Sequence, residues 1–189
     1  MVNETIEILK LLMRSREERL SIRRISQIRE VNYKSAYMAL GILEKKKIVN
    51  MEKTGNTTIC SFNNNFDEMV FRAESLRRED LFRNKDFLII HNRLSELKFP
   101  FIAVLFGSQA KGNSNKHSDI DILSIGGNEK KIRAALSLLP EKIHLTTISY
   151  ESFIRMAKSR EFSVVSEALK NNIILIGIEE YYRLLQNAR

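Results

Sequence analysis

Two apolar segments joined by a polar stretch constrain this chain more than any other feature of its sequence. Residues 101–106 are apolar and are followed directly by Gly107 and Ser108. The second segment, residues 120–125, is mostly apolar; Asp119 precedes it and Asp121 is its second residue. Apolar runs of this length are typical of buried strands. Because side chains two positions apart in a strand share a face, both carboxylates are expected on one face of the second strand.

These residue types suit the binding of a metal ion and a triphosphate. Two neighbouring carboxylates can share Mg²⁺, so Asp119 and Asp121 are candidate metal ligands. Gly107 lets the backbone approach a phosphate group closely, and the Ser108 hydroxyl and nearby N–H groups are donors. Lys111 adds a positive charge beside them. The expected cofactors are therefore Mg²⁺ and ATP or another nucleoside triphosphate; the alternative is a capped turn followed by a surface pair of acids.

Residues 105–123 resemble the nucleotidyltransferases of the DNA polymerase beta superfamily, especially the minimal nucleotidyltransferases of prokaryotes. The resemblance covers residues 100–186 approximately. It implies that the Gly-Ser turn holds the nucleotide phosphates and that the two aspartates bind divalent metal. It also implies transfer of a nucleoside monophosphate to an acceptor hydroxyl, with release of pyrophosphate.

The family has a third acid on the next strand, which helps to bind the catalytic metal and to activate the hydroxyl. Here that strand is expected at residues 143–149, and the matching position is His144. Asp119, Asp121 and His144 are therefore the candidate catalytic residues. Imidazole suits Mg²⁺ poorly, so nucleotide binding is better supported than turnover. A register shift of two residues would instead place Thr146 in the site.

Four other residues have side chains that could take part in a functional site. Gln109 stands where minimal nucleotidyltransferases often have arginine. His117, just before Ser118 and Asp119, is either a phosphate contact or, as is more common for a loop histidine, simply exposed. His91 lies on the apolar side of a predicted helix and is interpreted as structural. Cys60, the single cysteine, is interpreted as a small core residue.

The first third of the chain has a different pattern. Apolar residues recur at helical spacing in three short segments, and a hairpin follows around Thr54-Gly55-Asn56. The expected helices span residues 4–13, about 21–28 and 32–46, and the expected strands span 48–53 and 57–62. Ser21 and Asn32 are expected N-caps.

Residues 21–49 resemble winged helix-turn-helix transcription regulators, in which the helix after the turn enters the DNA major groove. Tyr33, Lys34, Ser35 and Tyr37 lie off the buried stripe near the start of that helix and are the candidate DNA contacts. Residues that could flank the DNA backbone are Arg23, Arg24 and Lys53.

Two features depart from a plain DNA-binding helix. Lys47 stands where the family usually turns with glycine, and Met38, Gly41 and Ile42 are apolar on a face that normally stays wet. A winged helix that serves only protein contacts or dimerisation therefore remains the alternative.

Length, charge and composition agree with a two-part protein. The chain has 189 residues, of which 43% are apolar and 29% charged, and its formal charge is +8. Residues 1–62 hold 12 Lys/Arg and 7 Asp/Glu, and so carry +5 of that charge, which suits a polyanionic partner. No apolar run is long enough to cross a bilayer, and with no secretion signal we expect a cytoplasmic protein.

The predicted fold class is α+β. We expect a winged helix of three helices and a β-wing at residues 1–62, a helical connector at 63–99, and a small mixed-sheet nucleotidyltransferase core at 100–189. Three functional hypotheses follow: an active transferase with a DNA-binding domain, a regulator that senses nucleotide without catalysis, and an antitoxin paired with a HEPN-type protein. The expected partners are double-stranded DNA, a nucleoside triphosphate and a HEPN-type protein, and the connector offers a surface for a homodimer.

Overall fold

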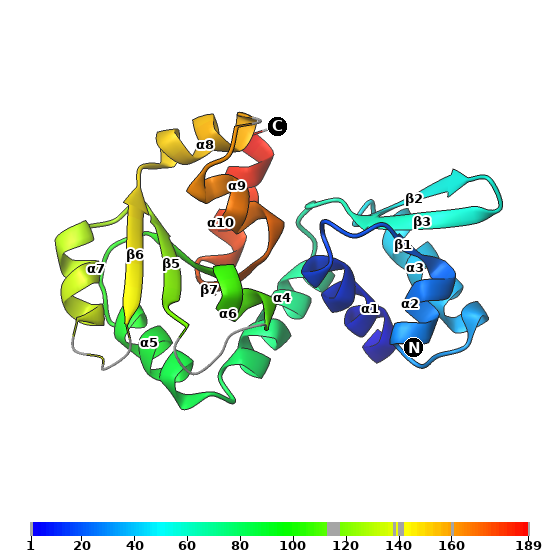
Figure 1. Ribbon diagram of the computed structural model, residues 1–189, viewed down its shortest axis with the longest axis horizontal. Helices are drawn as coiled ribbons and strands as arrows, with labels where there is room; N and C mark the ends of the chain where they lie inside the picture. The colour runs from blue at the N-terminus through cyan, green and yellow to red at the C-terminus, as the bar shows by residue number, and fades with distance from the viewer. Residues whose placement is uncertain (1, 113–117, 138, 140–141, 160, 189) are drawn as a thin grey trace. The chain divides into compact units, whose positions relative to one another are not determined.

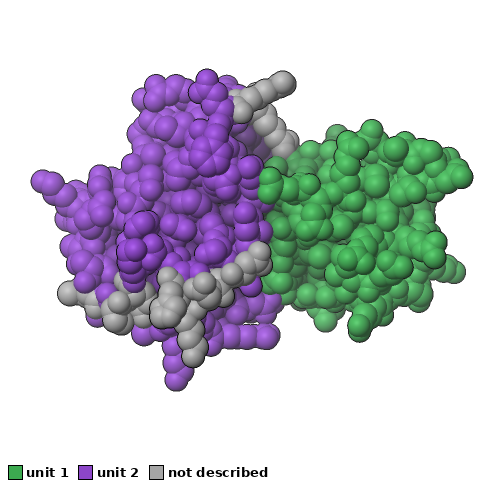
Figure 2. Space-filling view, in the orientation of Figure 1, with its two compact units in different colours: residues 1–75 green, residues 76–189 purple. Residues whose placement is uncertain are grey.

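The computed structural model describes residues 2–112, 118–137, 139, 142–159 and 161–188. Internal contacts divide the chain into two compact units, residues 1–75 and 76–189 (Figure 2). Both contain helices and one β-sheet, so the chain has the mixed α and β character that the sequence predicts. The helix α4 (Glu68–Leu81) runs through the division. No helix in the described ranges is long and apolar enough to span a membrane.

The first unit packs three helices with a small antiparallel sheet. Its elements are α1 (Val2–Arg14), β1 (Leu20–Ser21), α2 (Ile22–Ile28), α3 (Tyr33–Lys45), β2 (Val49–Thr54) and β3 (Thr57–Phe62). The strand order is β1-β3-β2, and both pairings are antiparallel. The predicted helices and hairpin are present. The two-residue strand β1 was not predicted, because two residues are too few to show an alternating pattern.

Side-chain caps set where the helices of this unit begin. Ser21 accepts a hydrogen bond from the Arg24 backbone N–H, and Asn32 accepts one from that of Ser35. Each cap satisfies one of the N–H groups that the first turn leaves without a helical partner. Ala36, Leu40 and Leu43 form the buried stripe of α3, whereas Ile28 of α2 is 39% exposed. Ile28 is the last residue of its helix, where the apolar spacing no longer controls burial.

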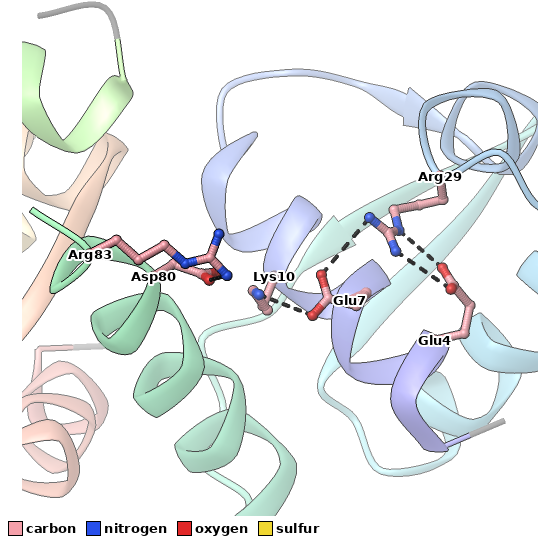
Figure 3. A network of polar contacts seen from close by, with 6 residues as sticks. All are labelled: Glu4, Glu7, Lys10, Arg29, Asp80 and Arg83. Carbon is pink, nitrogen blue, oxygen red and sulfur yellow. Dashed lines mark hydrogen bonds and ion pairs between the residues drawn. The ribbon is translucent and has the colours of Figure 1, made fainter.

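The turn between α3 and β2 is stabilised despite its lack of glycine. Lys47 adopts φ +58°, in the left-handed region that favours glycine. Its carbonyl oxygen accepts hydrogen bonds from the side-chain amides of Asn63 and Asn65, at 3.1 and 2.7 Å. These bonds from beyond β3 hold the turn in place. In the same unit, Arg29 forms ion pairs with Glu4 and Glu7 of α1 (Figure 3).

The second unit is built on a four-stranded mixed sheet (Figure 1). Its further elements are α5 (Lys85–Ser95), β4 (Ile102–Phe106), α6 (Gly107–Lys111), β5 (Ile120–Ile125), α7 (Glu129–Leu136), β6 (Ile143–Ile148), α8 (Tyr150–Lys158), α9 (Val164–Lys170), β7 (Asn172–Ile176) and α10 (Ile178–Asn187). The strand order is β6-β5-β4-β7. β5 and β6 are parallel, while β4 is antiparallel to both of its neighbours.

Alternate residues of the strands build the core on one face of this sheet. Ala103 and Leu105 of β4 and Ile120 and Ile122 of β5 pack in one cluster with residues of α5 and α7. The intervening residues, such as Leu123, are also buried and face the other side. Both faces are therefore covered, which explains why β4 and β5 read as continuous apolar runs.

Two arginines of α4 reach the edge strand β7. Arg77 is fully buried and donates a hydrogen bond to the Asn172 carbonyl oxygen. Arg78 donates to the Leu175 carbonyl oxygen at 3.1 Å. The Asn172 side chain in turn donates to the Tyr181 hydroxyl at 3.0 Å. The second half of α4 is thus attached to the sheet by polar contacts as well as by packing.

Candidate functional site

The two aspartates lie where β5 begins. Asp119 directly precedes the strand and Asp121 is its second residue, so both extend to the face opposite Ile120 and Ile122. Their side chains are 30% and 31% exposed. Farther along the same face, Leu123 is fully buried. The carboxylates therefore stand at the solvent-accessible end of an otherwise apolar face.

The Gly107 turn lies against one of these carboxylates. Phe106, the last residue of β4, is paired with Asp121 across the antiparallel ladder, so the next residue lies beside the carboxylate. Gly107 adopts φ +71°, and a Cβ atom built on it would lie 2.5 Å from Asp121 Oδ2. Real Cβ atoms do not approach other atoms that closely. Glycine is needed here for its backbone conformation and for the space it leaves.

Gly107 and the four residues after it form the five-residue helix α6, where the sequence predicts a turn. Ser108 is half-buried in its first turn, and Lys111 is exposed in its last. Gln109 donates through Nε2 to the Ser118 carbonyl oxygen at 3.2 Å. This bond connects α6 to the residue immediately before Asp119, and it gives a physical role to a position where the family often has arginine. His117 lies outside the described residues.

His144 lies across the parallel ladder from Asp121, in the register expected for the family's third acid. Its Nε2 is 3.8 Å from Asp119 Oδ2, and its Nδ1 is 3.9 Å from Asp121 Oδ1. Thr146 instead pairs with Leu123, farther from the aspartates. The structure therefore brings Asp119, Asp121 and His144 together on one face, at the junction of β5 and β6.

Sequence reasoning missed Lys142. Its Nζ lies 2.9 Å from Asp119 Oδ2, and its carbonyl oxygen accepts a hydrogen bond from the Ile120 N–H at 3.0 Å. Lys142 comes one residue before β6 and belongs to no motif. Only the register between β5 and β6 places it beside Asp119, and a register is not visible in one sequence.

The electrostatics of the pair favour a bound cation. Burial raises the pKa of the Asp121 carboxyl above its ordinary value; the nearby Asp119 charge also raises it, and His144 opposes both effects. A carboxylate with this environment is stabilised when a cation neutralises it. In the described structure the ammonium group of Lys142 lies beside the other carboxylate of the pair, 2.9 Å from Asp119 Oδ2.

The donor set fits magnesium bound with a nucleotide. No three His, Cys, Asp or Glu side chains in the described part of the chain are arranged to hold a metal ion by themselves. Mg²⁺, however, is usually bound through one or two carboxylates, with phosphates and water completing its coordination. Asp119 and Asp121 meet that requirement, and the imidazole of His144 is a poor Mg²⁺ ligand.

A second candidate site lies on α3 in the first unit. Tyr33, Lys34, Ser35 and Tyr37 are all exposed on the first half of this helix, where the sequence predicts them. The rings of Tyr33 and Tyr37 stack, with centroids 6.5 Å apart and an interplanar angle of 15°. Arg23, Arg24 and Lys53, the candidate flanking residues, are also exposed.

The same helix exposes apolar side chains. Met38 and Ile42 are 46% and 39% exposed. Ile42 also lines a cavity of about 350 Å³ together with residues of α1 and α4. The α3 surface therefore combines polar and aromatic donors near its start with apolar side chains farther along. Both readings of this helix, DNA contact and protein contact, have side chains that suit them.

The second unit thus combines a mixed sheet with a Gly-Ser turn at the end of β4 and two aspartates at the start of β5. The family model described as "Polymerase beta, Nucleotidyltransferase" matches residues 89–181, which include the turn, both aspartates and His144. This match supports a nucleotidyltransferase domain over these residues. Comparisons with curated proteins and with solved structures gave no match to the chain.

Proposed function

We propose that the second unit binds a nucleoside triphosphate with Mg²⁺ at the Gly107 turn and the Asp119–Asp121 pair, and that the first unit is a winged helix that binds double-stranded DNA. The nucleotide part rests on one observation above all: Gly107 lies so near Asp121 that a Cβ atom built on it would be 2.5 Å from Asp121 Oδ2. A phosphate chain that contacts the turn is then also within reach of a metal on the carboxylates.

Each residue has a distinct role in this proposal. The two aspartates hold Mg²⁺, which supplies charge neutralisation at the phosphates. Ser108 donates its hydroxyl to a phosphate oxygen, and Lys111 adds positive charge at the solvent side of α6. Gln109 keeps α6 in place relative to Asp119 through its bond to Ser118.

If the domain transfers its nucleotide, the bonds that change are defined. An acceptor hydroxyl oxygen forms a bond to the α-phosphorus, the bond from that phosphorus to the bridging oxygen breaks, and pyrophosphate leaves. The hydroxyl proton needs an acceptor, and in this proposal the acceptor is the imidazole of His144, whose nitrogens lie 3.8 and 3.9 Å from the Asp119 and Asp121 carboxylates.

Calorimetry of Mg-ATP binding tests the nucleotide site. We expect binding by the wild-type protein and none by Asp119→Ala/Asp121→Ala, because the double substitution removes both metal ligands. Glu96→Ala/Glu161→Ala is a charge-matched control, since both glutamates are exposed and neither is among the proposed site residues. Equal binding by the wild type and the aspartate double variant would show that the site is wrongly assigned.

A catalytically impaired nucleotide sensor is the second candidate function. It is favoured by His144, which occupies the strand position opposite Asp121 where the family has its third acid. With one fewer carboxylate, the site is suited to hold one metal ion better than two. The protein would then bind Mg-ATP and transfer nucleotide slowly.

Substitution of His144 by Asp distinguishes the two functions. General-base assistance contributes roughly 10²–10⁴-fold to a rate, so restoring a carboxylate should produce a clear increase in nucleotide transfer or in affinity for a second metal ion. His144→Asn is the control, because asparagine is similar in size to aspartate but lacks its negative charge. Rapid transfer by the wild type that His144→Asp does not increase would favour the active enzyme.

The DNA-binding part of the proposal is supported by the layout of the first unit. Three helices precede a hairpin, and the helix before the hairpin exposes donors for phosphate and base edges at its N-terminal half. The excess of positive charge in residues 1–62 agrees with contacts to a polyanion.

Gel shifts with the full chain at increasing salt test this part. We expect affinity for duplex DNA to fall steeply with salt, because phosphate contacts release counterions. Lys34→Ala and Tyr37→Ala should weaken binding. Glu52→Ala, on an exposed position of β2, is a control outside the α3 surface. Binding that responds neither to salt nor to the α3 variants would favour a protein-contact role for the first unit.

A further inference from the structure

The position of Lys142 indicates a role that the family match does not assign. The backbone of Lys142 is fixed, because its carbonyl oxygen accepts the Ile120 N–H beside Asp119. The side chain is 72% exposed, and its ammonium group lies 2.9 Å from Asp119 Oδ2. The residue is thus held at its base and free to move at its tip.

The ammonium group and a metal ion compete for the same carboxylate. Asp119 Oδ2 is one of the oxygens proposed to bind Mg²⁺, and it is also the partner of Lys142. A lysine ammonium is a compact point charge on a flexible four-carbon stem, so it can leave one anion and contact another nearby. Exposed ion pairs of this kind are weak and exchange readily.

The nucleotide offers the ammonium group a new partner. Phosphate oxygens that complete the coordination of a metal at Asp119 lie within a few ångströms of that carboxylate. Lys142 is fixed to the adjacent strand at the same level as Asp119, whereas Lys111 is at the far end of α6. Of these two lysines, only Lys142 contacts a carboxylate of the pair in the described structure.

We infer that Lys142 is a triphosphate-binding residue, whose ammonium group neutralises Asp119 before the metal binds and contacts the nucleotide phosphates afterwards. This inference rests on the proposed nucleotide site. It makes a two-sided prediction: Lys142 should weaken binding of the metal alone and strengthen binding of the metal–nucleotide complex. A purely structural surface ion pair would not produce opposite effects on the two ligands.

Binding of Mn²⁺, followed by the electron paramagnetic resonance signal of the free ion, measures both effects on the full chain. Without nucleotide, Lys142→Met should bind Mn²⁺ roughly threefold more tightly than the wild type, because removal of an exposed competing charge has a modest effect. At saturating Mn²⁺, calorimetry should show ATP binding weakened by about tenfold, because a charge-assisted hydrogen bond to phosphate is lost.

Two control variants make the result specific. Lys142→Arg keeps the charge and should resemble the wild type in both assays. Lys98→Met removes an exposed lysine before β4, at the end of the strand opposite the site, and should change neither measurement. Circular dichroism confirms that the variants are folded.

Each outcome decides between the claims. Unchanged or weaker Mn²⁺ binding by Lys142→Met, or unchanged ATP binding, overturns the role of Lys142 while the nucleotide site can stand. Mn²⁺ and ATP binding that survives Asp119→Ala/Asp121→Ala overturns the proposed site itself. A wild type that binds neither ligand overturns both.

Discussion

The substitution Gly107→Ala tests the close approach between the phosphate turn and the carboxylate pair. The new Cβ would lie 2.5 Å from Asp121 Oδ2, whereas ordinary contact begins at 3.4 Å, so the oxygen must retreat by about 0.9 Å. The left-handed conformation adds a cost of roughly 1–2 kcal/mol for a residue with a Cβ. Moving the carboxylate off its rotamer adds about 0.5–1.5 kcal/mol.

The displacement matters more for binding than for stability. Mg²⁺ demands near-ideal octahedral geometry, so a carboxylate that is displaced by this amount is lost as a ligand. In enzymes, a misplacement of a reacting group by about 1 Å can lower the catalytic rate on the order of 10²-fold, and we take this as the upper limit for the loss of binding here. We therefore expect Gly107→Ala to weaken Mg-ATP binding by roughly 10- to 100-fold in calorimetry while the protein remains folded.

Gly112→Ala is the matched control. Gly112 has φ +74°, nearly the same as Gly107, but a Cβ built on it meets no atom within 4 Å. The two variants share the backbone strain and differ in the contact with Asp121. If both bind Mg-ATP within about twofold of the wild type, the approach of Gly107 to Asp121 is unimportant, and the reasoning from the Gly107 geometry is refuted.

Three further predictions concern stability and reactivity. Lys47→Gly should raise the melting temperature, because the left-handed conformation of Lys47 costs about 1–2 kcal/mol. This cost exceeds the free-energy cost of the extra chain entropy that glycine brings to the unfolded state. An unchanged or lower melting temperature would contradict this prediction. Cys60 should resist alkylation in the folded protein and react after denaturation, because burial raises the pKa of its thiol to about 12. Burial lowers the pKa of His91, so stability should fall as pH drops below the ordinary histidine value of about 6.5, and His91→Gln should reduce that dependence.

The sign of the His91 effect follows from proton binding. A histidine whose pKa is lowered in the folded state binds more protons when the protein is unfolded. Stability is therefore lost as the pH falls from the ordinary histidine pKa toward the lower pKa of the folded state. His91 packs against Phe82, with ring centroids 4.7 Å apart, which agrees with the structural role predicted from its helix position. A pH profile that is identical in the wild type and His91→Gln would contradict this assignment.

The elements that the sequence predicts well are those with a strong apolar period. β4 and β5 are covered on both faces, so they appear as uninterrupted apolar runs, and their ends agree closely with the prediction. α3 is identified by its buried stripe and by the Asn32 cap. In contrast, β1 and α6 have two and five residues, fewer than a period needs to be recognised.

Site residues divide in the same way. Gly107, Ser108, Asp119 and Asp121 are visible because they form one local motif. Lys142 is 23 residues away from Asp119 and meets it only because Ile120 pairs with Ile143. The requirement for glycine at position 107 is equally invisible, since it depends on where the Asp121 side chain lies after folding. Information of this kind resides in strand register and not in sequence spacing.

The hydrogen bonds from Arg77 and Arg78 to β7 determine how the chain can be shortened. A fragment that starts at residue 100, where the sheet region begins in the sequence, would lack both donors and leave the buried Asn172 carbonyl without its arginine partner. Buried carbonyl groups that lose a partner are costly, so such a fragment should express poorly or aggregate. A fragment that starts at Glu68 keeps α4 whole. The smallest part of this protein suitable for isolated nucleotide-binding studies therefore begins well upstream of its first core strand.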